Sequence, residues 1–185
     1  MRKLILWNLL TLDGYFEGEK SWDLDWHSSI WGPELERLSI EQLSSADMLL
    51  FGRVTYEGMA AYWRTAEGEV ADLMNSLPKV VFSRTLREPD WANTTLVKDD
   101  AAAAVRALKQ QGDRDMFVFG SANLSATFTN EDLFDEYRLA IAPVVLGTGT
   151  PLFGRNLNRK SLTLLESRPL ASGGVILRYA PVGAG

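Results

Sequence analysis

The sequence contains no cysteine, and this absence excludes several kinds of chemistry. Disulfide bonds, thiolate nucleophiles and thiolate metal ligands all require cysteine. Histidine is nearly absent as well, because His27 is the only one in 185 residues. A lone histidine cannot form a histidine-rich metal site, and it leaves little room for Ser-His-Asp catalysis, so we expect no bound metal.

Positive charge and long apolar runs are also scarce. The formal net charge is −5 and no basic run stands out, so we expect no nucleic-acid partner. No apolar stretch approaches the ~20 residues that cross a bilayer, so we expect no membrane partner either. The apolar N-terminal run lacks a small-x-small cleavage site and leads into Asp13-Gly14, a turn, which indicates a first strand rather than a signal peptide. We therefore expect a cytoplasmic protein.

The order of apolar and amphipathic segments is typical of a single α/β domain, expected over residues 1–181 with a flexible tail at 182–185. Apolar runs predict strands at 4–12, 46–51, 79–82 and 116–119. Helical patterns are found at 33–44, 56–63 (with Thr55 as cap), 70–76, 101–111 and around 124–128. After residue 135, strands at 137–146, 161–166 and 175–179 follow without helices. This order predicts one mixed, mostly parallel sheet with helices on its faces and an antiparallel C-terminal end.

Three predicted strands end in the same way, with small or polar residues before a helix or a turn. These seams are Gly52-Arg53-Val54-Thr55, Ser83-Arg84-Thr85 and Gly120-Ser121-Ala122-Asn123. Ligands of open α/β sheets bind beyond the carboxyl ends of the strands, where helix N-termini favour phosphate. Arg53 and Arg84 could each offer a bidentate fork, and two such arginines favour NADPH over NADH. Each seam alone is more often just a turn with a solvated arginine, and it is the occurrence of three similar seams that raises the case for a binding site.

Five blocks of sequence carry a family resemblance. In chain order they are Leu12-Asp13-Gly14-Tyr15, Gly52-Arg53-Val54-Thr55-Tyr56-Glu57, Ser83-Arg84-Thr85-Leu86, Gly120-Ser121-Ala122-Asn123-Leu124, and Asp135-Glu136-Tyr137-Arg138-Leu139 with Ala142-Pro143-Val144-Val145-Leu146-Gly147 after it. Together they resemble the dihydrofolate-reductase-like superfamily over about residues 2 to 180. The branch they resemble is the reductase domain of the riboflavin-biosynthesis deaminase–reductase, in a stand-alone form because no deaminase signature precedes it.

This resemblance implies a three-layer α-β-α fold with about eight strands, bound NADPH and hydride transfer. It also implies a set of cofactor-binding residues: Gly52, Arg53, Thr55, Ser83, Arg84, Thr85, Gly120, Ser121, Ala122, Asn123 and Leu124. The sequence departs from the family at Ser121, where the relatives carry the second glycine of a Gly-Gly pair.

Residues for catalysis and substrate binding are less well specified. Asp13 would lie near the nicotinamide, and Asn8 is an amide in an otherwise apolar strand, so both are candidate catalytic residues. Asn8 could point into the pocket or satisfy backbone groups, and the sequence leaves both open. Tyr15, Trp26 and Trp31 could contact a flat heterocycle, although tryptophan more often packs in a core. His27 is a weaker candidate for a proton donor.

We therefore expect an NADPH-dependent reductase that transfers a hydride to a small heterocyclic, pterin-like or ribosylaminopyrimidine-like substrate. The alternative is an NADP(H)-binding sensor or binding module without turnover, because no clear catalytic acid is present. Besides the small-molecule substrate, the expected partner is a second copy of the chain in a homodimer.

Overall fold

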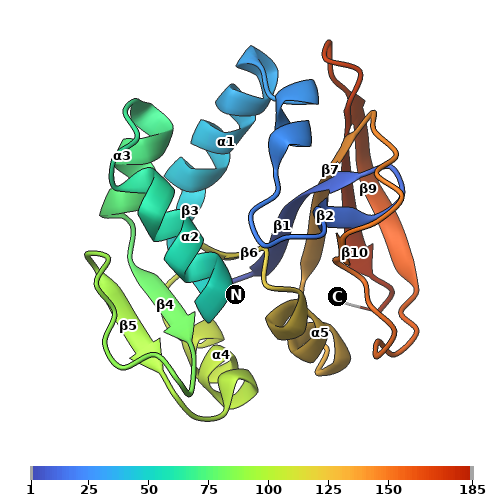
Figure 1. Ribbon diagram of the computed structural model, residues 1–185. Coiled ribbons are helices and arrows are strands. Elements are labelled where there is room, and N and C mark those ends of the chain that lie inside the picture. The colour runs from blue at the N-terminus through green and yellow to red at the C-terminus, as the bar shows by residue number, and fades with distance from the viewer. Residues whose placement is uncertain (1, 184–185) are drawn as a thin grey trace.

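Eight strands form one sheet in the computed structural model, which describes residues 2–183 (Figure 1). In spatial order they are β5 (Thr94–Val97), β4 (Lys79–Phe82), β3 (Ala46–Gly52), β6 (Asp115–Phe119), β1 (Leu4–Thr11), β7 (Glu136–Ala142), β10 (Val175–Pro181) and β9 (Leu162–Pro169). The strands from β5 to β7 are parallel, whereas β10 pairs antiparallel with β7 and with β9. The predicted mixed sheet with an antiparallel C-terminal end is confirmed.

Helices cover both faces of this sheet (Figure 1). One core contains the side chains of α1 (Pro33–Ser45), α2 (Arg53–Trp63), α3 (Glu69–Ser76) and the short 3-10 helix η1 (Asp25–Ser29). The other contains those of α4 (Ala101–Lys109) and α5 (Ala122–Asn130). Along β1, Ile5 and Trp7 join the first core, while Leu4 and Leu6 join the second. A strand buried on both faces is apolar almost throughout, which explains the N-terminal apolar run.

The structure corrects two predicted boundaries. Helix α2 begins at Arg53 with Gly52 as its N-cap, so the prediction of Thr55 as the cap is wrong. The Thr55 hydroxyl instead accepts a hydrogen bond at 2.8 Å from the hydroxyl of Ser121, which follows the neighbouring strand β6. Strand β7 ends at Ala142 rather than at 146. Pro143 follows directly and has no N–H to donate, so the ladder stops there.

Two very short strands and one edge strand were not predicted. Strands β2 (Tyr15–Glu17) and β8 (Thr150–Pro151) pair with each other, and the polar edge strand β5 carries little apolar pattern. Among residues 2–183, no helix is long and apolar enough to cross a membrane, and no cluster of three acidic or histidine side chains could hold a metal. Of the predicted tail, 184 and 185 lie outside the described residues, and the domain limits stay a prediction.

Candidate functional site

Strands β1 and β6 separate at the carboxyl end of the sheet. Their last paired residues are Trp7 and Phe119, whereas β1 continues to pair with β7 as far as Thr11. Asn8 is the first residue of β1 beyond the β6 pairing, and its Oδ1 accepts a hydrogen bond from the Gly120 N–H at 2.9 Å. The amide oxygen thus satisfies a backbone donor at the point where the strands part. A crevice of this kind is where open α/β sheets bind ligands.

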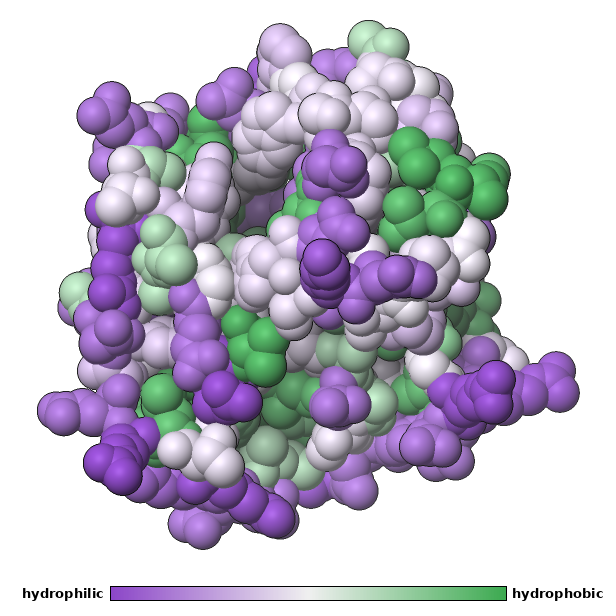
Figure 2. Space-filling view, in the orientation of Figure 1, coloured by the Kyte–Doolittle hydropathy of each residue, from purple (hydrophilic) through white to green (hydrophobic). Residues whose placement is uncertain are grey.

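A cavity of about 570 Å³ lies over this crevice. Figure 2 shows apolar surface between α2 and α5, where the cavity opens. Its walls come from the carboxyl ends of β1 and β6, from the loop after β1, and from the first turns of α2 and α5. The seams at 52–55 and 120–124 therefore meet in one cavity, although about 65 residues separate them in the chain.

Both helices that begin at the cavity lack a side-chain cap. Gly52 is the N-cap of α2 and Ser121 that of α5, and neither residue has a side chain that accepts a hydrogen bond from the first turn of its own helix. Helix α4 differs, because the carboxylate of Asp100 accepts a hydrogen bond from the Ala103 N–H at 3.0 Å. Uncapped first turns leave backbone N–H groups free for an anion, and the helix dipole favours negative charge there.

Ser121 connects the two helix starts. Its backbone is left-handed, with φ 58° and ψ 63°, a conformation that glycine adopts more easily. The hydroxyl accepts a hydrogen bond from the Gly52 N–H at 2.8 Å and donates one to Thr55 Oγ1 at 2.8 Å. Gly120 before it has φ 54°, and a Cβ there would lie 2.9 Å from Thr55 Oγ1. The serine thus has the positive φ that glycine favours and adds a bridge, which occupies the Gly52 N–H.

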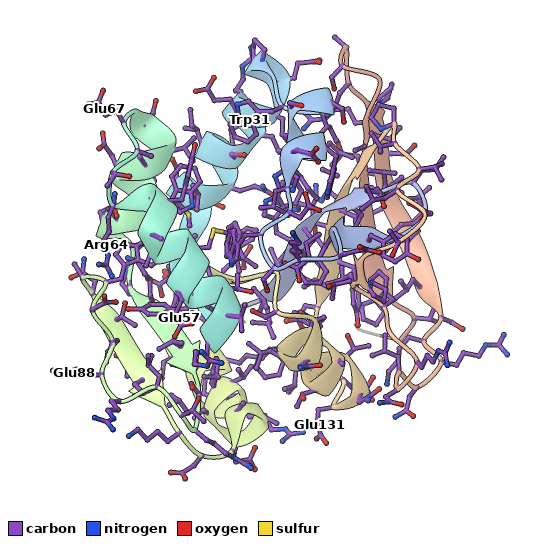
Figure 3. All side chains as sticks on the ribbon, viewed as in Figure 1. Trp31, Glu57, Arg64, Glu67, Glu88 and Glu131 are labelled. Carbon is purple, nitrogen blue, oxygen red and sulfur yellow. The ribbon has the colours of Figure 1, made fainter. Side chains whose placement is uncertain are left out.

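The two predicted arginines lie in different places. Arg53 lines the main cavity, and its guanidinium forms an ion pair with Glu57 at 3.0 Å, with both side chains nearly half exposed. Figure 3 shows Glu57 on the outer side of α2. Such an exposed pair is weak, so the arginine can exchange its partner for a phosphate. Arg84 lines a second hollow of about 810 Å³, which shares Phe82 and Thr127 with the main cavity.

Lys98 also lines this second hollow, and sequence reasoning missed it. It directly follows β5, whose sequence Thr-Thr-Leu-Val has too few apolar residues to predict a strand, so no strand end was expected there. Asp99 and Asp100 line the hollow too, and the Asp100 carboxylate is engaged in capping α4. Arg84 and Lys98 therefore provide two cations beside the carboxyl ends of neighbouring strands β4 and β5.

The remaining residues of the middle seam have a structural task. Ser83 Oγ accepts hydrogen bonds from the Thr85 N–H at 3.2 Å and from the Leu86 N–H at 3.0 Å, which holds the turn after β4. Ser83 lines the second hollow, whereas Thr85 lines neither the hollow nor the main cavity.

Asp13 lies outside the cavity lining and is exposed. Its carboxylate accepts hydrogen bonds from Thr11 Oγ1 at 2.7 Å, the Gly147 N–H at 2.7 Å and the Leu146 N–H at 3.1 Å. The Thr11 hydroxyl and then the two backbone donors lower the pKa of Asp13 to about 2. The structure thus engages Asp13 in joining the loops after β1 and β7, and its catalytic role stays a prediction.

The three predicted substrate residues do not line the cavity. Trp26 is 6% exposed and packs in the first core, and Tyr15 is half-buried in β2. Trp31 is 45% exposed and lies just before the start of α1, where Figure 3 labels it. The sequence could not show which aromatic rings turn toward the cavity.

Trp22, between β2 and η1, and Phe16 of β2 are aromatic residues of the cavity lining that sequence reasoning overlooked as site residues. Trp22 makes the closer contact with a helix. It lines the cavity, and its indole lies directly on Gly58 of α2, where a Cβ would overlap the ring. The backbone of Trp22 has φ 68°, and its backbone N–H donates a hydrogen bond to Glu17 Oε2 at 3.1 Å. A glycine inside an otherwise helical pattern was the signal that could have indicated a close contact.

Two buried polar atoms of the cavity lining lack a hydrogen-bond partner among the described residues. They are Asn8 Nδ2 and His27 Nε2. The Gly120 N–H fixes the orientation of the Asn8 amide, because it requires the oxygen on its side. Burial lowers the pKa of His27 to about 4, so the imidazole is neutral at pH 7. Buried polar groups are normally bonded, so unpaired ones in a cavity mark positions for a ligand.

Comparison with known proteins agrees with this geometry. The family model of the RibD C-terminal domain matches residues 2–176. The uncharacterized protein YyaP of Bacillus subtilis (strain 168) is 36% identical over 183 residues, covering 96% of this chain and 94% of YyaP. A putative riboflavin biosynthesis protein from Shewanella sp. PV-4 has a similar structure, with a TM-score of 0.80, 23% identity, and coverage of 97% of this chain and 98% of that one.

A more distant structure has the same architecture. Dihydrofolate reductase from Enterococcus faecalis, complexed with NADP(H), superposes with a TM-score of 0.66 at 10% identity, over 97% of this chain and 96% of its own. The fold is therefore that of dihydrofolate reductase, as the sequence resemblance implied. The extent of the family match and the identity to YyaP show that the chain belongs to the RibD C-terminal domain family.

Proposed function

We propose that the protein is an NADPH-dependent reductase that transfers a hydride to a small heterocyclic substrate. The observation that carries this proposal is the continuity of the two hollows. The main cavity is lined by the uncapped starts of α2 and α5 beside the crevice, and the second hollow is lined by Arg84 and Lys98. A dinucleotide with an extra phosphate needs this combination of backbone donors and separate cations.

The residues present fit such a cofactor. Gly120, with its positive φ, brings backbone close to the cavity, and a Cβ at this position would crowd Thr55. Free N–H groups at the start of α5, at Ala122 and Asn123, would hold the pyrophosphate, and Arg53 would add a charge from α2. Arg84 and Lys98 would hold the 2′-phosphate.

NADPH would supply the hydride, and the chain would supply position and shelter. Asn8 joins β1 to the Gly120 loop, so it would keep the substrate side and the cofactor side in register. Trp22 covers the cavity from the side of α2 and would exclude water from the ring pair. Positioning of two reactants and exclusion of water are the main contributions that proteins make to hydride transfer.

Titration with NADPH and NADH, followed by quenching of tryptophan fluorescence, tests the cofactor proposal. We expect NADPH to bind more tightly than NADH. We expect Arg84→Ala and Lys98→Ala each to weaken the binding of NADPH by ~1.5–3 kcal/mol, the contribution of a hydrogen bond to a charged group. Both variants should leave NADH nearly unchanged. Arg87→Ala is the matched control, because Arg87 is exposed and lies outside both hollows.

Equal affinity for NADPH and NADH, with no effect of Arg84→Ala, would overturn the assignment of the second hollow. Oxidation of NADPH in the presence of a flat heterocycle then separates the two candidate functions. Tight NADPH binding without oxidation across a panel of such compounds would favour the NADP(H)-binding sensor.

We also propose that two copies of the chain associate through β9. This edge strand exposes three leucines, with Leu162 38%, Leu164 52% and Leu165 51% exposed. Exposed apolar edge strands favour pairing with another chain. Sedimentation should show a dimer that Leu164→Glu converts to a monomer, and a monomeric native protein would refute this proposal.

A further inference from the structure

The main cavity has two parts. The cofactor half is formed by the seams at 52–55 and 120–124, and the substrate half by β1, the segment from β2 to η1, and Met59 of α2. The two halves differ in charge. The aromatic and aliphatic side chains Trp7, Phe16, Trp22, Leu24 and Met59 make up most of the substrate half. Among the described residues that line the whole cavity, Arg53 is the one permanent cation, and it belongs to the start of α2. Glu17 is the charged residue of the substrate half. No positive side chain is therefore available there to hold a substrate phosphate.

The neighbouring surface does not supply this charge either. A shallow hollow behind Trp22 contains Lys20, but Glu19 and Asp23 line the same hollow and outnumber it. The net charge of the whole chain is −5. A phosphate arm that extends from the substrate half would therefore meet negative rather than positive potential.

Apart from Glu17, the polar groups of the substrate half are uncharged, and two of them lack a hydrogen-bond partner among the described residues. Asn8 is 6% exposed, its Oδ1 is occupied by Gly120, and its Nδ2 is a fixed donor without a partner among the described residues. His27 Nε2 is likewise buried and unpaired, and its imidazole stands edge-on to Trp26 with ring centroids 4.4 Å apart. A neutral imidazole can donate or accept one hydrogen bond at Nε2.

Resting on the proposed reductase function, we infer that the substrate is a flat, uncharged heterocycle without a phosphate group. It offers an acceptor oxygen or nitrogen to Asn8 Nδ2 and a polar ring atom to His27 Nε2. The surrounding aromatic rings contact its faces. This narrows the expected substrates, because it retains the ring of pterin-like or aminopyrimidine compounds and excludes forms that carry a sugar phosphate. Asn8 and His27 are the residues that determine this specificity.

Two matched pairs of probes test the inference on the full chain saturated with NADP⁺. They are 7,8-dihydroneopterin with its 3′-monophosphate and uridine with uridine 5′-monophosphate, which cover a bicyclic and a monocyclic ring. We expect at least one phosphate-free member to bind, and its phosphorylated partner to bind roughly tenfold more weakly or worse, a difference of about 1.4 kcal/mol. Equal or tighter binding of the phosphorylated partner, or no binding of either phosphate-free probe at about 1 mM, overturns the inference.

Variants then test the two anchors. Asn8→Asp keeps the acceptor for the Gly120 N–H and removes the free donor, and His27→Phe keeps a flat ring beside Trp26. Each should weaken the bound phosphate-free probe roughly tenfold, the effect of one lost hydrogen bond. Ser28→Ala is the control, since Ser28 lies in the same short helix but is exposed and outside the lining.

Probe affinities unchanged in both variants would refute the role of these anchors. NADPH affinity, titrated separately for each protein, distinguishes this failure from failure of the reductase proposal. If only the substrate inference is wrong, the native protein still binds NADPH. If the native protein does not bind NADPH, the proposed reductase function is itself refuted.

Discussion

The bridge formed by Ser121 allows a quantitative test of the cofactor loop. Ser121→Ala removes the hydroxyl that accepts from the Gly52 N–H and contacts Thr55, and it retains a non-glycine residue at φ 58°. An unpaired, partly buried N–H costs ~1–3 kcal/mol, so we expect the free energy of unfolding to fall by about that amount. Ser121→Gly loses the same bonds but relieves the left-handed backbone, which costs other residues roughly 1–2 kcal/mol.

The two variants should therefore differ in a defined direction. After allowance of about 0.4–1 kcal/mol for the greater freedom of glycine in the unfolded chain, Ser121→Gly should be the more stable by roughly 1 kcal/mol. Urea unfolding followed by tryptophan fluorescence measures both. Ala122→Gly is the control, because Ala122 is helical and glycine there should be destabilising by about 0.5–1 kcal/mol. If Ser121→Ala proves as stable as Ser121→Gly, the reasoning about this backbone is refuted.

Three further changes test other contacts. Gly58→Ala places a methyl group where the Trp22 indole lies, so we expect the loop to shift and acrylamide quenching of fluorescence to increase; unchanged quenching would contradict the contact. The pKa of His27 is about 4 in the folded protein and 6.5 in the unfolded chain. Between pH 4 and pH 6.5 the imidazole is therefore protonated in the unfolded chain and neutral in the folded protein. The free energy of unfolding of the unmodified protein should therefore fall as the pH drops from 6.5 to 4. In His27→Phe the free energy of unfolding should depend less on pH over this range. Equal slopes for the two proteins would count against a buried neutral imidazole. Glu136 is 1% exposed and accepts hydrogen bonds from Arg178 at 2.6 Å and Arg138 at 2.9 Å. Removal of its charge in Glu136→Gln should cost ~3–5 kcal/mol in urea unfolding, because it leaves the buried guanidinium of Arg138 without a carboxylate, whereas Arg178 keeps its ion pair with Glu166; a loss below ~1 kcal/mol would exclude that role.

Local sequence patterns account for most of the fold. Apolar runs such as 4–12 and 79–82 mark buried strands because most residues of a strand covered on both faces are apolar. The predicted end of β7 fails for a local reason, Pro143, whereas the predicted start of α2 fails because a contact distant in sequence intervenes. Thr55 was expected to cap a helix, but it is the third residue of α2 and its hydroxyl bonds to Ser121 instead.

The candidate site divides in the same way. The sequence by itself determined the seams at 52–55 and 120–124, since strand ends, glycines and helix starts are local signals and parallel strands bring their carboxyl ends to one edge. Only the tertiary structure decided that Lys98 lies beside Arg84, that Trp22 rests on Gly58, and that Asn8 keeps a free donor. Each of these depends on the packing of segments that are remote in the chain, and no local spacing encodes which faces meet.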